Sequence, residues 1–292
     1  VVLGVLVFVF FMVQAVGDAV SLMLPSEVAP EIRENMRETL GLNDPLHERF
    51  FREVGGWIRG DFGDSLWQRT PALPLALSRI PNTLFLTAVS LSIALPIAIT
   101  LGAISAIRPR SLIDRTLTAV SLAGVSVADF WLGLMLILVV GVQLQWLPTS
   151  GFGGINYALL PALALAFRPI GRIAQVARSA LVEEMEKPYI LTARSKGLTE
   201  RGVVWRHAMR NAAIPTITVT GDETATFLNG AVVIETIFAW PGIGQLFIQA
   251  IQRRDLPLVE ACVFVVALMT IALNLIVDLT YAAIDSRARI QK

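Results

Sequence analysis

Two long stretches without charge most constrain what this chain can fold into. No Asp, Glu, Lys, Arg or His occurs between Arg79 and Arg108, or between Asp129 and Arg168. A helix needs about 20 apolar residues to cross the hydrocarbon core of a bilayer, and both stretches are longer than this. The chain is also 54% hydrophobic and only 16% charged, which is unusual for a soluble protein. We therefore predict an all-α membrane protein.

The apolar segments predict six transmembrane helices. Most are hydrophobic on all faces, as expected for helices surrounded by lipid. The first, at residues 1–17, is slightly short for a span. We interpret it as a truncated transmembrane helix rather than a signal peptide. The chain then continues with an outer segment at 18–80 and a core at 81–292. The remaining spans are predicted near Asn82–Ile107, Thr116–Val142, Tyr157–Val182, Asn211–Ile237 and Leu256–Ile284.

The short loops between the predicted spans differ in their content of Lys and Arg. One side carries the loop at 108–115, the segment at 172–210 and the C-terminal tail, all rich in these residues. The opposite side carries an uncharged loop at 145–156 and a loop with only two arginines near residue 253. Because Lys and Arg accumulate on the cytoplasmic side of membrane proteins, both termini are predicted to be cytoplasmic.

The outer segment at 18–80 is predicted to be ordered. Pro30–Leu40 favours a short helix that ends at Gly41. A second helix follows, with Asp44 as its cap and Pro45 at its first position. We favour packing of this helix onto the membrane domain over direct contact with a partner protein. Its apolar stripe consists of Phe50, Phe51, Val54 and Trp57.

The segment at about 183–213 is basic and helix-forming although it lies between two predicted spans. Helix-favouring residues run from Glu183 to Lys196, and Gly197 is placed to end this helix in a left-handed cap. Thr199 can then cap a second helix that reaches about Arg210. The sequence therefore predicts a helix, a tight turn and a second helix on the cytoplasmic side.

This helical turn has features suited to contact with a soluble protein. Ala193 and Gly197 lie one helical turn apart, so we expect them to form a flat patch that another surface can approach closely. Arg194 and Lys196 flank the patch with positive charge. A basic loop that touches anionic lipid headgroups is the alternative interpretation. A DNA-binding role is disfavoured because both flanks enter the bilayer.

Ionisable residues inside the predicted spans are further functional candidates, because a charge near mid-membrane costs at least about 2.5 to 3.5 kcal/mol on insertion scales. Arg168, Asp222 and Glu223 lie at similar depths in the fourth and fifth spans. Arg168 can form a structural ion pair with either carboxylate, or the acidic residues can line a path for cationic groups. Adjacent helical residues point about 100° apart, so one carboxylate can pair while the other faces the path. Asp129 is a weaker candidate for the lining.

The residues after the fifth predicted span are candidates of a different kind. Trp240 and Pro241 can form part of an external gate, although a Trp at this depth is also typical of an interfacial anchor. His47 and His207 are isolated in the sequence, so no metal site is predicted.

Several motifs resemble permease subunits of bacterial ABC importers. The stretches Tyr189–Leu198 and Arg206–Pro215 are similar to the EAA loop of the oligopeptide/dipeptide/nickel branch. Leu191 stands at the glutamate position of the general EAA pattern, Thr192 at its first alanine, and Arg210 where many importers have proline; these departures are typical of that branch. Further similarity lies in "GLNDPLHERF", "GDFGDSLW", "FWLGLMLIL", "QWLPTSGFGG", "VVIETIFAWPGIG" and "NLIVDLTYAAID".

The resemblance implies a type I ABC importer permease fold in the bacterial inner membrane. The chain is expected to pair with a homologous permease subunit, two ABC ATPase subunits and an extracytoplasmic substrate-binding protein, and to contact no nucleic acid. Because the sequence has no G-x-x-x-x-G-K-[ST] phosphate loop, ATP and Mg are expected on the ATPases and no cofactor on this chain. The substrate is left open among peptides, nickel chelates, glutathione and other small solutes. The implied ATPase-coupling residues are Thr192, Ala193, Arg194, Ser195, Lys196, Gly197 and Leu198.

A proton-coupled secondary transporter is the alternative, with Asp129, Asp222 and Glu223 as proton carriers. It does not explain the helical turn at 183–213, and no inverted repeat is evident between the two halves. A membrane enzyme is disfavoured because the sequence contains neither H-E-x-x-H nor G-x-S-x-G.

Overall fold

The computed structural model describes residues 4, 7, 11, 31 and 43–284. The chain divides into two compact units. Unit 1 comprises residues 1–81 and 242–269, and unit 2 comprises residues 82–241 and 270–292. The first predicted span at 1–17 and the predicted helix Pro30–Leu40 lie, apart from isolated positions, outside the described residues.

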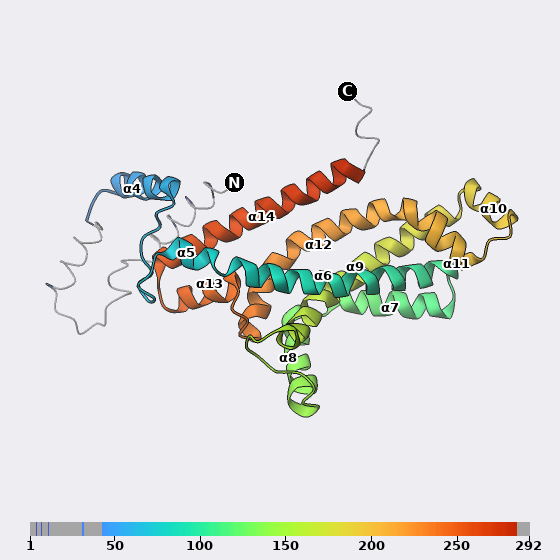
Figure 1. The fold of residues 1–292 in the computed structure, drawn as a ribbon, viewed down its shortest axis with the longest axis horizontal. Coiled ribbons are helices and arrows are strands. Elements are labelled where there is room, and N and C mark those ends of the chain that lie inside the picture. The colour runs from blue at the N-terminus through green and yellow to red at the C-terminus, as the bar shows by residue number, and fades with distance from the viewer. Residues whose placement is uncertain (1–3, 5–6, 8–10, 12–30, 32–42, 285–292) are drawn as a thin grey trace, which may run out of the picture. The chain divides into compact units, whose positions relative to one another are not determined.

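Unit 2 is built from long helices that run beside one another, with short helices α10 and α11 at one end (Figure 1). The long helix α9 packs against both α7 and α12 and also contacts α8. The elements are α6 (Ile80–Ile107), α7 (Leu112–Ser126), α8 (Asp129–Leu136), the π-helix η1 (Ile137–Gln143), α9 (Ile155–Met185), α10 (Pro188–Ser195), α11 (Glu200–Gly202), the π-helix η2 (Val203–Ala208) and α12 (Met209–Ile237).

Small residues bring these helices into close contact. A Cβ atom at Gly171 of α9 would lie 2.3 Å from the carbonyl oxygen of Ser121 on α7. A Cβ atom at Gly102 of α6 would lie 2.8 Å from the Cβ atom of Ala177 on α9. Lipid tails are as apolar as Leu, so membrane helices associate largely through close packing at small residues. The small residues of α9 therefore allow this helix to pack closely against both α6 and α7.

Three helical stretches of the described residues are long and apolar enough to cross a membrane: Ala72–Ile107, Ile155–Met185 and Leu256–Thr280. They match the second, fourth and sixth predicted spans. The fifth, predicted at Asn211–Ile237, forms the helix α12 of 29 residues but is less apolar, because threonines and an acidic pair interrupt it.

The third predicted span, Thr116–Val142, is wrong as a single continuous helix. The chain bends by 100° between α7 and the pair α8–η1, because Val127 and Ala128 adopt extended backbone conformations. Neither Pro nor Gly occurs at the break. Asp129 lies in the first turn of α8, where the helix dipole favours a negative charge. The apolar pattern continues across the bend and so could not reveal it.

Unit 1 contains α4 (Leu46–Arg59), α5 (Ala72–Leu77), α13 (Ile243–Gln252) and the first half of α14 (Leu256–Ile284). Fully buried Asp255 accepts hydrogen bonds from Ser65 Oγ (2.5 Å) and from the backbone N–H of Trp67 (3.1 Å). It also accepts one from the N–H of Leu258 (3.3 Å). One carboxylate therefore caps α14 and holds the stretch "GDFGDSLW" against its first turn.

Two details of unit 1 differ from expectation. Pro45 is the N-cap of α4 and Asp44 does not cap it; Asp44 instead pairs with Arg52. In the predicted stripe, Trp57 is buried and donates to Glu260 Oε2 (3.3 Å), whereas Phe51 is 70% exposed. The amphipathic helix α13 was not predicted, because we interpreted its sequence as part of a loop.

Candidate functional site

The predicted helical turn forms an elbow, defined here as residues 187–208. Pro188 occupies the first turn of α10, where its missing N–H costs no hydrogen bond. Gly197 follows the helix with φ of 79°, a left-handed conformation that favours glycine. Thr199 Oγ1 then accepts from the N–H of Gly202 (3.3 Å) and caps α11. The predicted cap residues are therefore confirmed, although the helix begins at Pro188 rather than at Glu183.

The inner face of the elbow is fixed to the rest of unit 2. Ile190, Val203 and Val204 are fully buried in one cluster with Leu181 of α9 and alanines of α6. An arginine–carboxylate pair also joins the two arms, with Arg194 Nε 2.8 Å from Glu200 Oε1 and Nη2 3.1 Å from Oε2. The elbow is thus a packed element and not a free loop.

A polar cluster at the end of α9 holds the base of the elbow. Buried Glu184 accepts hydrogen bonds from Lys187, from Tyr189 Oη (2.5 Å) and from Asn211 Nδ2 (3.3 Å). Burial raises the pKa of Tyr189, and its bond to Glu184 raises it further. The Tyr189 hydroxyl therefore stays protonated and donates over the physiological pH range.

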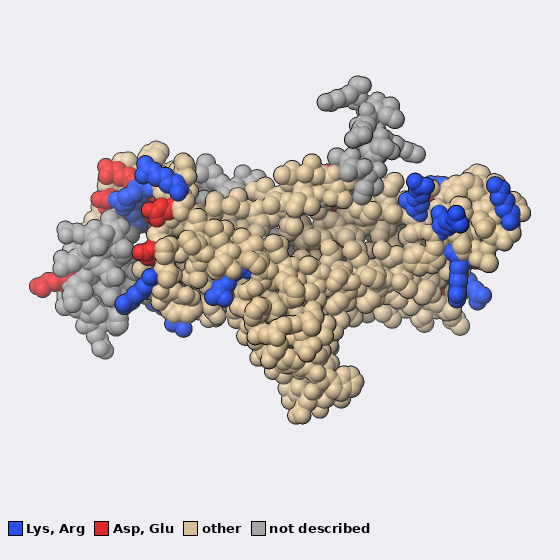
Figure 2. All heavy atoms as spheres, viewed as in Figure 1, with Lys and Arg blue, Asp and Glu red and all other residues tan. Residues whose placement is uncertain are grey.

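The outer face of the elbow is exposed and mixed in character. Leu191 is 62% exposed and Trp205 is 50% exposed, while Thr192, Ser195, Lys196, Gly197 and Leu198 are also exposed. Lys and Arg side chains gather over the end of unit 2 that carries α10 and α11 (Figure 2). Sequence analysis does not identify Trp205 as part of this surface. The one feature that could have indicated it is the presence of a large aromatic side chain within a basic segment.

The flat patch predicted from Ala193 and Gly197 does not form. Ala193 is buried in the elbow's own core, whereas Gly197 is exposed and a Cβ atom there would meet nothing within 4 Å. The two residues face differently because α10 ends before Gly197. The exposed surface of the elbow is thus centred on the turn at Gly197 and does not include Ala193.

A second candidate lies between α8, α9 and α12. Arg168 Nη2 lies 3.5 Å from Glu223 Oε2, and Arg172 Nη1 donates to Glu223 Oε1 at 2.9 Å. The predicted pairing of Arg168 is therefore confirmed with Glu223, which is fully buried, whereas Asp222 is exposed. Sequence analysis does not identify Arg172 as part of this site, because the residue begins the Lys/Arg-rich segment 172–210 that is predicted to be cytoplasmic.

These residues line a cavity of about 180 Å³. Asp129 of α8 also lines it, and the bend between α7 and α8 is what brings this carboxylate to the two charged helices. The structure thus brings together three of the four predicted path residues around one space.

An ionic cluster near the elbow was not predicted. Asp114, in the first turn of α7, is 3% exposed and accepts from Arg178 Nε (2.5 Å) and Nη2 (2.6 Å) on α9. It also accepts from Ser105 of α6 and from the N–H of Arg110 (2.7 Å). One carboxylate therefore ties together the ends of three helices.

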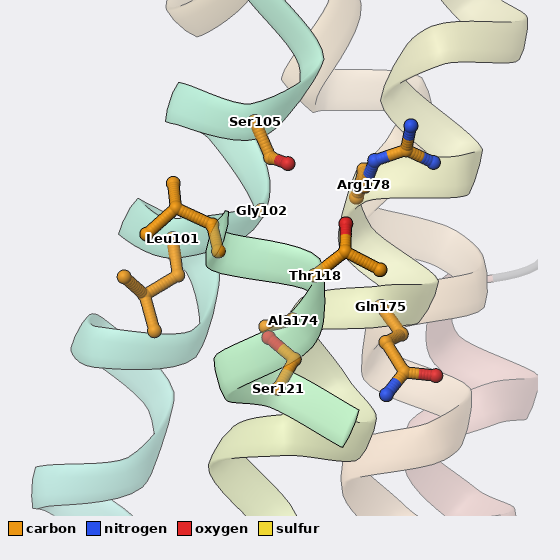
Figure 3. A pocket seen from close by; sticks show the side chains of 9 residues that line it. Leu101, Gly102, Ser105, Thr118, Ser121, Ala174, Gln175 and Arg178 are labelled. Carbon is orange, nitrogen blue, oxygen red and sulfur yellow. The ribbon is translucent and has the colours of Figure 1, made fainter. Parts of the chain in front are cut away.

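Next to this cluster lies a small space of about 10 Å³, shown in Figure 3. Its lining comes from α6, α7 and α9. The Nε2 atom of Gln175 is buried without a hydrogen-bond partner. The volume corresponds to about one water molecule, which is far too small for a transported solute.

The two candidate gate residues lie at the end of α12. Trp240 is fully buried, and its Nε1 donates to the carbonyl oxygen of Asn82 at 3.0 Å. Asn82 Nδ2 in turn donates to the carbonyl oxygen of Pro241 at 2.8 Å, and the rings of Phe85 and Trp240 stack at 6.1 Å. Trp240 is therefore not an interfacial anchor but a packed link between α6 and the end of α12.

Comparison with known proteins decides the family. The model of the family described as "Binding-protein-dependent transport system inner membrane component" matches residues 98–290. The chain belongs to this family. It is therefore a permease component of an ABC importer. The family match favours the ABC importer interpretation over the alternative of a proton-coupled secondary transporter.

The permease resembles several curated proteins over nearly its whole length. It is 38% identical to the oligopeptide transport system permease protein AppB of Bacillus subtilis, over 98% of this chain and 94% of AppB. It is 35% identical to the di/tripeptide permease DppB of Pseudomonas aeruginosa, over 99% of this chain and 95% of DppB. Identity to the glutathione permease GsiC of Escherichia coli is also 35%, over 99% of this chain and 94% of GsiC.

Solved structures share the permease fold at lower identity. An amino acid ABC transporter has a TM-score of 0.55 at 17% identity, over 72% of this chain and 94% of its own. The MetNI methionine ABC transporter has a TM-score of 0.55 at 21% identity, over 70% of this chain and 95% of its own. The family match includes both the elbow and the cavity.

Proposed function

We propose that the chain is one of two homologous permease halves of an ATP-driven importer for peptides or similar small solutes. The names of its relatives support this class, since they refer to oligopeptides, di- and tripeptides and glutathione. Two ATPase subunits bind and hydrolyse MgATP, and an extracytoplasmic binding protein delivers the solute. This chain hydrolyses no ATP and holds no cofactor.

In this proposal six helices cross the inner membrane. They are the segment at 1–17, α6, the bent unit α7–α8–η1, α9, α12 and α14. The elbow and both termini are cytoplasmic, and the segment at 18–80 is extracytoplasmic. The concentration of Lys and Arg around the elbow supports this orientation.

The elbow is the coupling element, and its tip docks in a cleft of one ATPase. The observation that carries this assignment is the exposed, left-handed Gly197 at the tip of an element whose inner face is fully packed. Such an element transmits displacement because it cannot deform independently of α6 and α9. Residues 192–198 form the contact, with the exception of buried Ala193, which supports it from inside.

The cavity between α8, α9 and α12 is part of the translocation path. Asp129, Arg168 and Glu223 are its charged wall, and exposed Asp222 faces away from this wall on the same helix. Trp240 and Pro241 belong to the outer gate, where they join α6 to α12.

Gly197→Trp tests the coupling role. Because a side chain at this position meets nothing within 4 Å in the chain itself, the added bulk should disturb the partner and not the permease core. We expect ATP-dependent peptide uptake into vesicles to fall about tenfold or more, the scale of a coupling energy of 1–3 kcal/mol. Substrate-stimulated ATP hydrolysis should fall with it, while the complex still co-purifies.

Two matched variants separate bulk from backbone strain. Gly197→Ala adds one methyl group and the left-handed penalty of about 1 kcal/mol, whereas Gly197→Asn tolerates that conformation. Both should retain most of the uptake. Normal transport by Gly197→Trp, or equal losses in all three variants, would contradict docking at this turn.

A further inference from the structure

The cavity between α8, α9 and α12 has room for a small organic group. Its volume of about 180 Å³ is more than ten times the roughly 10–15 Å³ that a cavity needs to hold one water molecule. Apolar side chains of Leu165 and Phe227 form one part of the wall. The polar groups that face it are the charged residues and Thr226. The space therefore combines a hydrophobic surface with a few fixed charges, as ligand sites commonly do.

The charge of Glu223 is already compensated. Its carboxylate lies 2.9 Å from Arg172 Nη1 and 3.5 Å from Arg168 Nη2, and its side chain is fully buried. Two cations thus hold one anion in place. Arg172 donates a hydrogen bond and Arg168 contributes an ion pair, so both positive charges lie next to Glu223.

Asp129 is in a different situation. Its Oδ1 atom is buried and has no hydrogen-bond partner, and no cation of the described residues lies within ion-pair distance of this carboxylate. Leaving a buried polar atom unpaired costs about 1–3 kcal/mol, and more for a charged group. Glu223 Oε2 also accepts no hydrogen bond, but Glu223 is paired with two arginines. Asp129 is therefore the carboxylate of this cavity that has a buried, unpaired oxygen and no ion pair.

We propose that the cavity is a transient subsite for a primary ammonium group of the transported solute, with Asp129 as its acceptor. The inference rests on the proposed translocation path and assigns it a chemical preference. Glu223, held by its two arginines, forms a fixed part of the wall and does not bind the cation itself. The ammonium group supplies the donors that Asp129 lacks, while the apolar wall accommodates the neighbouring carbon atoms.

The test measures charge preference inside the cavity of the assembled complex in membrane vesicles. Cys262, the one cysteine of the chain, is first replaced in Cys262→Ala, and Thr226→Cys then introduces a thiol into the cavity wall. The thiol is labelled with aminoethyl methanethiosulfonate, a cation, or sulfonatoethyl methanethiosulfonate, an anion. After correction for their rates with a free thiol, the cation should react about tenfold faster or more, as expected beside an unpaired carboxylate.

Asp129→Asn should abolish this preference. Asp222→Asn removes the same charge from an exposed position on α12, one helical turn from position 226, and should preserve the preference. No reaction at position 226, no preference for the cation, or equal effects of the two variants would overturn the proposal.

Competition identifies the source of the ammonium group. Trialanine presents it as an amino terminus, Nα-acetyl-lysine presents it on a side chain, and N-acetyl-trialanine has none. Slower labelling with one of the first two, and not with the third, supports the subsite; no protection by either rejects it. A complex that imports peptides without any charge preference would keep the proposed function and reject only this inference.

Discussion

Asp114 illustrates how one carboxylate holds several helices together. It accepts two hydrogen bonds from Arg178 and others from Ser105 and the Arg110 backbone. Removing one partner of a buried ion pair is costly because the other charge remains buried without compensation. The contribution of this residue is therefore expected to be much larger than that of a surface pair.

Asp114→Asn should destabilise the permease by about 3 kcal/mol, the lower part of the range for broken buried pairs, since Arg178 is partly exposed. Asp44→Asn is the matched control because its pair with Arg52 is about half exposed, and it should change stability by less than about 1 kcal/mol. The melting temperatures of the two purified complexes provide the comparison. Similar melting temperatures would show that the cluster does not stabilise the helix ends.

The structural role of a single residue could be predicted where it depends only on neighbouring residues in the sequence. Gly197 and Thr199 could be identified as cap residues because a left-handed backbone and a free N–H depend on a few neighbouring residues. Ala193 and Arg172 could not, because their environments depend on which helices pack beside them. A pattern of small residues indicates close contact but not which partner makes it.

At the scale of helices, α9 depends on glycine to approach its neighbours. The Cβ position of Gly171 lies 2.3 Å from the Ser121 carbonyl oxygen, a backbone atom that cannot rotate away. Even one methyl group must therefore push α7 from α9.

Gly171→Ala should cost about 1–3 kcal/mol, as overpacking usually does. Gly55→Ala makes the same chemical change in α4, where the added methyl group meets nothing within 4 Å. There the higher helix propensity of Ala should increase stability by up to about 1 kcal/mol. Thermal unfolding monitored by circular dichroism distinguishes the two. A tolerated Gly171→Ala would imply that α7 and α9 are less closely packed than described.

Helices were predicted well where apolar length alone decides them. The ends of α6 and α12 agree with expectation because their apolar runs end in loops or polar residues. The bend before Asp129 was missed, since a continuous apolar run is compatible with either one straight helix or two. The short helices α5 and α13 were missed because, at 6 and 10 residues, they are shorter than the stretch over which helical periodicity is recognised.

At the scale of the whole molecule, the predicted orientation can be tested chemically. In a Cys262→Ala background, Ser195→Cys and Gln252→Cys each provide one exposed thiol on opposite sides of the proposed topology. A membrane-impermeant maleimide should label Gln252→Cys in intact spheroplasts and Ser195→Cys only in inverted vesicles. Labelling of both from the same side would rule out the proposed orientation.

Helix α9 runs without interruption from Glu184, at the base of the elbow, to Arg168 in the cavity wall. At 1.5 Å per residue, these two positions are about 24 Å apart along one rod. In the proposed coupling role of the elbow, a displacement imposed there by an ATPase would be carried along α9 to the guanidinium groups that pair with Glu223. Such a displacement of α9 would shift the cavity wall that carries Arg168 relative to the wall that carries Glu223 on α12.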